Sequence, residues 1–178
     1  MLAGLEQEVA SDVPTLSCSD WGKWEQSAGR VTGVANSVGS SCRIIRDIAD
    51  LHFSCDLNFS TAECAGVVLR VDEAEGVWLL MDRVRARVAM GRASYRVFYG
   101  WSELSGGDTA LCAVECGRTY KLRCFARDEQ FEWYLDDRWI AALALDQVAA
   151  SGDVELFVER GQALFTNIRI ALVEPFPT

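Results

Sequence analysis

Period-two alternation of apolar and polar residues constrains this chain more than any other feature of its sequence. The clearest case is Phe53–Phe59, whose first, third, fifth and seventh residues are apolar while the residues between them are polar. Successive side chains of a strand point to opposite faces, so this pattern predicts a strand with one buried face. Similar short runs recur toward the C-terminus with turn-forming residues between them, which is typical of antiparallel sheets.

We expect a further strand wherever such a run lies between turns. These strands are Gly66–Val71, Val77–Asp82, Arg85–Met90, Tyr95–Tyr99, Tyr120–Cys124, Phe131–Leu135, Trp139–Leu145, Val154–Glu159 and Ala163–Val173. The connections are predicted at Glu73–Gly76, Ser105–Asp108, Arg127–Gln130, Asp136–Arg138, Ser151–Asp153 and Gly161. A short helix over Ala141–Ala150 is the alternative there, because Ala and Leu favour helices.

Roughly ten to twelve short strands without convincing crossover helices predict an all-β fold, either a sandwich or a barrel. The prolines, at positions 14, 175 and 177, lie outside the expected strands and interrupt no ladder. With 178 residues the chain has the length of one domain. We expect an acidic tail or linker over residues 1–15 and a single sandwich domain over residues 16–175.

Net charge and cysteine content limit the possible binding partners and the cellular compartment. The formal net charge is −9, so the surface repels phosphate backbones and anionic lipids, and we expect neither nucleic acid nor membrane as a partner. Seven cysteines cannot all pair within one chain, and the N-terminal residues do not resemble a signal peptide. We therefore expect a cytoplasmic protein whose reduced thiols behave as small core residues, without structural disulfides.

Residues that could support catalysis or bind a metal are sparse. His52 is the single histidine, and no second close pair completes a zinc set with Cys112 and Cys116, so we expect no metal and no cofactor. His52 and Cys55 are three residues apart in a predicted strand and face opposite ways, which argues against a catalytic dyad. The chain also lacks the Glu-x-Asp-x-x-Glu pattern of laminarinase-like sandwich glycosidases.

Aromatic residues suggest a binding role instead, because exposed rings stack on the apolar faces of sugars. Trp101 lies in a polar context, and Tyr134 falls between Glu132 and Asp136 on the polar side of its predicted strand. These four residues, Trp101, Glu132, Tyr134 and Asp136, are the candidate carbohydrate-binding residues. The alternative for aromatic residues in general is a place in the core or at its edge, and we expect Trp78, Trp133 and Trp139 to fill the core.

Three segments resemble the C-terminal β-sandwich module of glycoside hydrolase family 32, the β-fructosidases and invertases. They are the strand ending in Asp-Arg at Val77–Arg83, the strand pair within Leu122–Asp137 and the closing hairpin Leu156–Ile170, and the likeness spans roughly residues 50–172. The closing pattern also occurs across concanavalin-like jelly rolls, including laminin-G-type modules. The resemblance implies a two-sheet antiparallel β-sandwich of the concanavalin-like jelly-roll type. It also implies that this sandwich accompanies a catalytic five-bladed propeller.

The family's catalytic motifs, Asn-Asp-Pro-Asn and Arg-Asp-Pro, belong to that propeller and do not occur here. Glu115 and Cys116 resemble the family's acid/base Glu-Cys pair but fall inside the expected sandwich, so no catalytic residue is carried over. The leading hypothesis is a non-catalytic accessory module that contacts carbohydrate, including fructosides, and packs against a catalytic propeller domain or a second copy of itself. A free-standing concanavalin-like carbohydrate-binding module is the alternative, and a small glycosidase is a third hypothesis.

Overall fold

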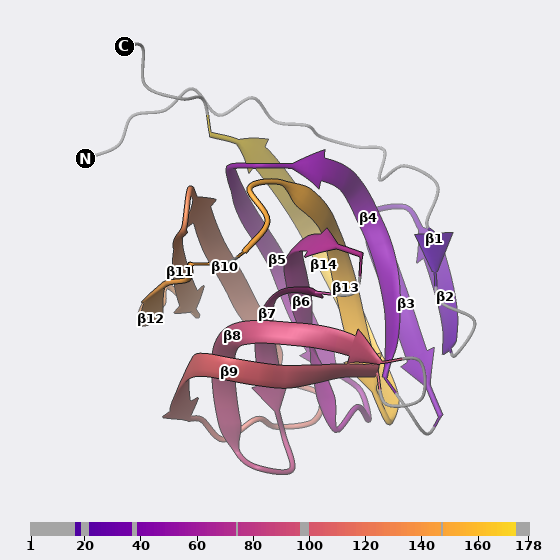
Figure 1. The fold of residues 1–178 in the computed structure, drawn as a ribbon. Coiled ribbons are helices and arrows are strands. Elements are labelled where there is room, and N and C mark those ends of the chain that lie inside the picture. The colour runs from indigo at the N-terminus through magenta and orange to yellow at the C-terminus, as the bar shows by residue number, and fades with distance from the viewer. Residues whose placement is uncertain are drawn as a thin grey trace.

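The computed structural model describes residues 17–18, 22–36, 39–73, 75–96, 100–146 and 148–173, with the side chains of residues 17, 95–96 and 100–107 outside that description. The described residues form antiparallel strands and contain no helix (Figure 1). The strands are β1 (Ser17–Cys18), β2 (Gly22–Ser27), β3 (Arg30–Ala35), β4 (Ser40–Ile48), β5 (Leu51–Phe59), β6 (Cys64–Asp72), β7 (Glu75–Asp82), β8 (Arg87–Arg96), β9 (Gly100–Leu111), β10 (Thr119–Arg127), β11 (Gln130–Leu135), β12 (Arg138–Ala144), β13 (Gly152–Glu159) and β14 (Gly161–Leu172).

The strands form two seven-stranded sheets that pack face to face. Sheet A has the order β1-β4-β13-β6-β7-β8-β9, and sheet B has the order β12-β11-β10-β5-β14-β3-β2. In Figure 1, β8 and β9 run across the lower front, while β10, β11 and β12 lie together at the left. The fold is therefore the predicted two-sheet antiparallel β-sandwich.

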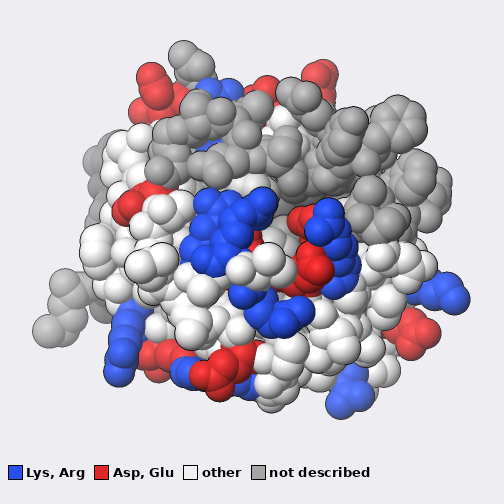
Figure 2. Space-filling model, turned by 90° about the horizontal axis from the view of Figure 1, so that it is seen from below, with Lys and Arg blue, Asp and Glu red and all other residues white. Residues whose placement is uncertain are grey.

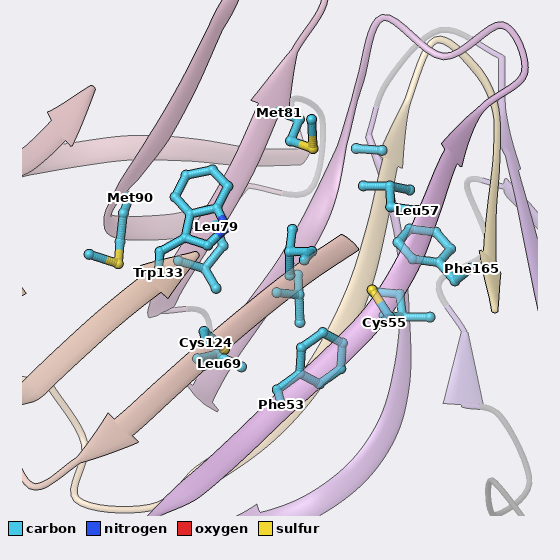
Figure 3. Close-up of a cluster of buried hydrophobic side chains, with 14 of the residues drawn as sticks. Phe53, Cys55, Leu57, Leu69, Leu79, Met81, Met90, Cys124, Trp133 and Phe165 are labelled. Atoms are coloured by element: carbon cyan, nitrogen blue, oxygen red, sulfur yellow. The ribbon is translucent and has the colours of Figure 1, made fainter. Parts of the chain in front are cut away.

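The main core lies between the two sheets and is built from the alternating residues seen in the sequence. Phe53, Cys55 and Leu57 of β5 are almost fully buried, and Trp133 of β11 is fully buried. Figure 3 shows these side chains together with Leu79 and neighbouring residues from both sheets. Because alternate residues along each strand enter this core, the intervening residues must form the outer faces of the sheets.

The outer face of sheet A carries a second buried apolar layer. Its alternate residues Val67, Leu79 and Met90 belong to the main core, so their neighbours along each strand point away from it. Those neighbours form a separate cluster of buried residues: Cys64, Val68, Val71, Trp78, Leu80, Ala89, Ala93 and Phe157. Sheet A is thus buried on both faces in this region.

A buried arginine fastens loops at one end of the sandwich. The Arg70 side chain, 1% exposed, donates hydrogen bonds to the carbonyl of Ala49 (2.9 Å), to a carboxylate oxygen of Asp50 (2.9 Å) and to the carbonyl of Asp128. Its guanidinium also lies over the Phe131 ring, 5.1 Å from the ring centre. The ends of β4, β6 and β10 are held together by this one side chain.

Ion pairs connect neighbouring loops elsewhere. Arg160 contacts Glu63 at 3.0 Å, and Arg85 contacts Asp82 at 2.8 Å. Figure 2, the view from below, shows basic and acidic side chains lying next to each other rather than a continuous basic stripe on that face. No helix of the described residues is long and apolar enough to cross a membrane.

Several strand predictions are confirmed, and some are wrong. The strand predicted at Trp139–Leu145 is confirmed as β12, which ends one residue earlier at Ala144, and the helical alternative does not occur in its described residues. The predicted loop Ser105–Asp108 lies inside β9, whose pairing with β8 absorbs the Gly-rich stretch through register shifts. Of the predicted strand Tyr95–Tyr99, the first two residues end β8, and residues 97–99 lie outside the described residues. The strands before Phe53 were not individually predicted.

Candidate functional site

The outer face of sheet B brings together residues from three consecutive strands. Tyr134 of β11 lies opposite Arg123 of β10 on one side and opposite Trp139 of β12 on the other. One row further along, Glu132 lies opposite Phe125. Residues directly opposite each other share a face of the sheet, so these side chains all point away from the core. We call Trp139, Tyr134, Phe125 and the adjoining His52 the aromatic face.

Trp139 is the exposed ring of this face and corrects a prediction. Its side chain is 60% exposed, whereas we expected it in the core beside Trp133. The pairing of β11 with β12 shifts register between Trp133 and Tyr134. The shift leaves Ala141 opposite Trp133 on the buried side and Trp139 opposite Tyr134 on the outer side. A local bulge in an edge strand therefore decides which way this indole points.

Tyr134 and Glu132, both sequence candidates, act together. The Tyr134 hydroxyl donates a hydrogen bond to Glu132 Oε2 at 2.9 Å, and this bond raises the pKa of Tyr134. One guanidinium, that of Arg123, lies over the Tyr134 ring at 5.1 Å, and the Phe125 ring meets it edge-on at 5.8 Å. Since part of the Tyr134 ring is covered, this residue contributes a fixed hydroxyl more than a free stacking surface.

Charged groups border the aromatic face. Arg123 and Lys121 both contact the Asp137 carboxylate, at 3.0 and 3.3 Å. His52 stacks on Phe125 with ring centres 4.3 Å apart and an interplanar angle of 4°. The face therefore combines one open indole with fixed carboxylates and a guanidinium, an arrangement that can contact an amphipathic ligand through both apolar stacking and hydrogen bonds.

Asp136, another sequence candidate, does not join this group. Its carboxylate accepts hydrogen bonds from Arg118 Nη2 and from the backbone N–H of Lys121, each at 2.9 Å. Its own N–H donates to the carbonyl of Lys121 at 2.8 Å. The residue has a positive φ of 50° in the turn between β11 and β12. Its carboxylate oxygens are engaged in fixing this turn.

The fourth candidate, Trp101, falls in β9, opposite Tyr95 at the edge of sheet A. Its backbone thus belongs to the other sheet from Tyr134. Its side chain lies outside the described residues. A shared surface for Trp101 and Tyr134 stays a prediction that no observation tests.

A hollow of about 500 Å³ lies where the edge strands β9 and β12 come together. Tyr120 is part of its lining, and Arg118 covers the Tyr120 ring at 4.6 Å. The Tyr120 oxygen accepts a hydrogen bond from the backbone N–H of Glu115 (2.8 Å) and donates to the carbonyl of Ala113 (3.3 Å), which fixes the loop from β9 to β10. Besides Tyr120, the hollow is lined by Val88, Ala110, Leu111, Cys112, Ala113, Glu115, Arg118, Leu135, Asp136, Arg138 and Ile140.

The residues considered for catalysis lie on two elements, Glu115 and Cys116 on the loop between β9 and β10 and His52 and Cys55 on β5. No group of three or more His, Cys, Asp or Glu side chains lies close enough to hold a metal ion within the part of the chain that the structure describes. Glu115 and Cys116 are both exposed, on the loop between β9 and β10. His52 and Cys55 face opposite sides of β5, since Cys55 is buried in the core and His52 lies on the outer face.

No protein-family model matches the sequence. No curated protein matches it either.

The fold is shared with several solved structures at low sequence identity. The carbohydrate binding module CBM66 from Bacillus subtilis superposes with a TM-score of 0.74 and 19% identity, covering 88% of this chain and 94% of that one. A Bacillus subtilis protein of unknown function with a galectin-like fold gives a TM-score of 0.70 and 8% identity, with 96% and 100% covered. Aspergillus kawachii β-fructofuranosidase gives 0.61 and 11%, covering 96% of this chain and 28% of the enzyme. The chain therefore has the jelly-roll fold of these sandwiches.

Proposed function

We propose that this chain is a non-catalytic carbohydrate-binding module and that the aromatic face of sheet B holds the sugar. The observation that carries the proposal is Trp139, an indole 60% exposed beside the hydrogen-bonded pair of Tyr134 and Glu132. A sugar ring presents an apolar C–H face and a rim of hydroxyls. Trp139 would stack on that face, while Glu132, Asp137 and Arg123 would accept or donate hydrogen bonds at the rim.

The structural neighbours support the same ligand class. One of the best superposed is itself a carbohydrate binding module of nearly equal length, which favours a module of this kind that folds by itself. The region that matches the fructofuranosidase covers 28% of that enzyme's chain. This match supports the leading hypothesis of an accessory domain of a family 32-like enzyme. A catalytic domain, a second copy of this chain and a cytoplasmic location remain proposals.

The absence of the propeller motifs from the sequence leads us to expect no hydrolysis of sucrose, inulin or levan by this chain. Glycoside hydrolysis uses a pair of carboxyl groups set on either side of the scissile bond. On the aromatic face, Glu132 is bonded to Tyr134, and Asp137 is neutralised by Arg123 and Lys121. Both carboxylates are therefore already engaged by neighbouring side chains.

The test is calorimetric titration with fructo-oligosaccharides and gluco-oligosaccharides at millimolar concentration. We expect one of these series to bind, and Trp139→Ala to weaken that binding by about tenfold, which is about 1.4 kcal/mol. The matched control is Leu111→Ala, because Leu111 is 93% exposed and lines the hollow between β9 and β12. Binding lost in Leu111→Ala and kept in Trp139→Ala would move the site to that hollow. No binding to either series would favour a purely structural role.

A further inference from the structure

Two of the seven cysteines face each other across neighbouring strands. Cys18 of β1 is the direct pairing partner of Cys42 of β4 in an antiparallel ladder. Residues directly opposite in such a ladder have Cα atoms about 4.5–5.5 Å apart, within the 4.4–6.8 Å span that a disulfide bridges. The two thiols are also close enough to hydrogen-bond to each other.

The other cysteines lack this arrangement in the described strands. Cys55 lies opposite Leu122, and Cys124 lies opposite Phe53, so these two core thiols are offset along the ladder rather than opposed. Cys112 and Cys116 lie on the loop that leads from β9 to β10, and Cys64 pairs with Asp82. Register therefore singles out one pair among the thiols of the described residues.

Accessibility differs between the two thiols in a useful way. Cys18 is exposed, whereas Cys42 is fully buried. Burial raises the pKa of each thiol, and the neighbouring Glu155 carboxylate raises it further. Both residues are therefore mainly protonated thiols at neutral pH, and they react through the thiolate form, whose population increases as the pH rises. A soluble oxidant can reach Cys18 alone, and Cys42 is placed to react only with Cys18.

We propose that Cys18 and Cys42 are a modification site that closes to an intramolecular disulfide when the protein meets a small-molecule disulfide oxidant. In the first step the Cys18 thiolate attacks one sulfur of oxidised glutathione, forming a mixed disulfide and releasing one glutathione thiolate. In the second step the Cys42 thiolate attacks the Cys18 sulfur and releases the second glutathione. The protons lost by the two cysteines are taken up by the two glutathione thiolates, so the protein is oxidised and glutathione reduced by two electrons.

The bond would secure the shortest described strand of sheet A. The strand β1 has two residues, pairs only with β4 and forms an edge of the sheet. A covalent link there joins the edge strand to the nine-residue strand β4. It also lowers the conformational entropy of the unfolded chain, which stabilises the folded state. In a reducing compartment the same pair stays as two thiols. The proposal does not depend on whether the protein binds sugar.

The experiment incubates the full chain with oxidised glutathione at pH 8.5, alkylates the remaining thiols, and measures the intact mass and the peptide map. We expect two alkylatable thiols to disappear, a loss of two hydrogens in mass, and a cross-linked peptide that joins positions 18 and 42. The thermal midpoint should rise by roughly 5–10 °C and fall back on adding dithiothreitol.

Two variants complete the test. Cys18→Ser, an exposed position expected to fold, should abolish both the cross-link and the thermal shift, while Cys116→Ser, equally exposed, should leave both unchanged. Seven alkylatable thiols after oxidation would overturn the proposal. A cross-link between other positions, one that persists in Cys18→Ser, or a stable glutathione adduct on Cys18 without closure would also overturn it.

Discussion

The two sheets differ in what their outer faces expose, although both carry a tryptophan there. On sheet A, Trp78 is 5% exposed and stacks on Phe157 with ring centres 6.4 Å apart, among Val68 and Leu80. On sheet B, Trp139 is 60% exposed beside Tyr134. An aromatic residue on an outer face is thus no sign of a binding surface by itself, since burial decides whether it stabilises the fold or remains available to a ligand.

Two ion-paired aspartates, Asp82 and Asp137, also differ in exposure. Asp82 of sheet A, with a side chain 2% exposed, contacts Arg85 at 2.8 Å and Arg87 at 3.5 Å. Asp137, in the turn that joins β11 and β12 of sheet B, has a side chain 58% exposed and contacts Lys121 and Arg123 at 3.3 and 3.0 Å. The partners are alike and the environments are not, so the two carboxylates should differ in their contribution to stability.

The largest expected difference concerns the two tryptophans. Trp78→Ala should lower the free energy of unfolding by about 3–5 kcal/mol, because it leaves a cavity in a buried layer. Trp139→Ala should change it by about 0.5 kcal/mol or less. Urea denaturation of both variants measures this. Trp78→Phe is the control, since Trp78 Nε1 has no hydrogen-bond partner in the described structure and the phenyl ring keeps most of the packing. Equal losses for both alanine variants would contradict the comparison.

Asp82→Asn comes next, with an expected loss of about 2–3 kcal/mol. Burial raises the pKa of Asp82, but the hydrogen bonds and ion pairs with Arg85, together with Arg87, outweigh it, and the net pKa is lowered. When the pKa of a carboxyl is lowered in the folded state, its ionised form stabilises the fold. This contribution to the free energy of unfolding is fully present above the ordinary pKa of about 3.9 and is lost as the pH falls through the pKa of the folded state. Unfolding should therefore depend on pH below about 4 less steeply in the variant than in the parent chain.

The next prediction concerns ligand binding by the outer face of sheet B. Glu132→Gln should weaken binding of the preferred oligosaccharide about three- to fivefold, because a neutral amide replaces a charged acceptor while its carbonyl still accepts from the Tyr134 hydroxyl. Calorimetric titration measures the change. Glu115→Gln removes another exposed carboxylate, on the loop between β9 and β10, and should leave the affinity unaltered. If both variants bound with parental affinity, Glu132 would have no part in the site.

The smallest effect is expected for Asp137→Asn. Exposed ion pairs contribute about 0–1 kcal/mol and are screened by salt, so the variant should lose less than about 1 kcal/mol, and the loss should shrink in 1 M NaCl. Denaturation at low and high salt measures this. A loss as large as that of Asp82→Asn would show that exposure does not separate the two carboxylates.

The sequence predicted those parts of the fold that follow from local chain geometry. In β5, β10 and β11 the strict alternation placed Phe53, Leu122 and Trp133 in the core and Glu132 and Tyr134 outside, as the structure has them. Side chains alternate because of the backbone itself, so no knowledge of partners was needed. The pairing of Tyr134 with Glu132 on one face follows from the same rule.

The features that depend on contacts between strands were set by the tertiary structure. Trp139 looked like a core residue, and a bulge in the pairing of β12 with β11 turned it outward. The Gly-rich stretch at Ser105 looked like a loop, and pairing with β8 made it part of β9. The alternation placed Asp136 on the same side as Glu132 and Tyr134, and the structure adds that its carboxylate accepts hydrogen bonds from Arg118 and the Lys121 N–H in a turn. Each outcome was fixed by contact with a neighbouring segment of the chain. Strand pairing, register shifts and burial arise between segments and cannot be deduced from the alternation within either one.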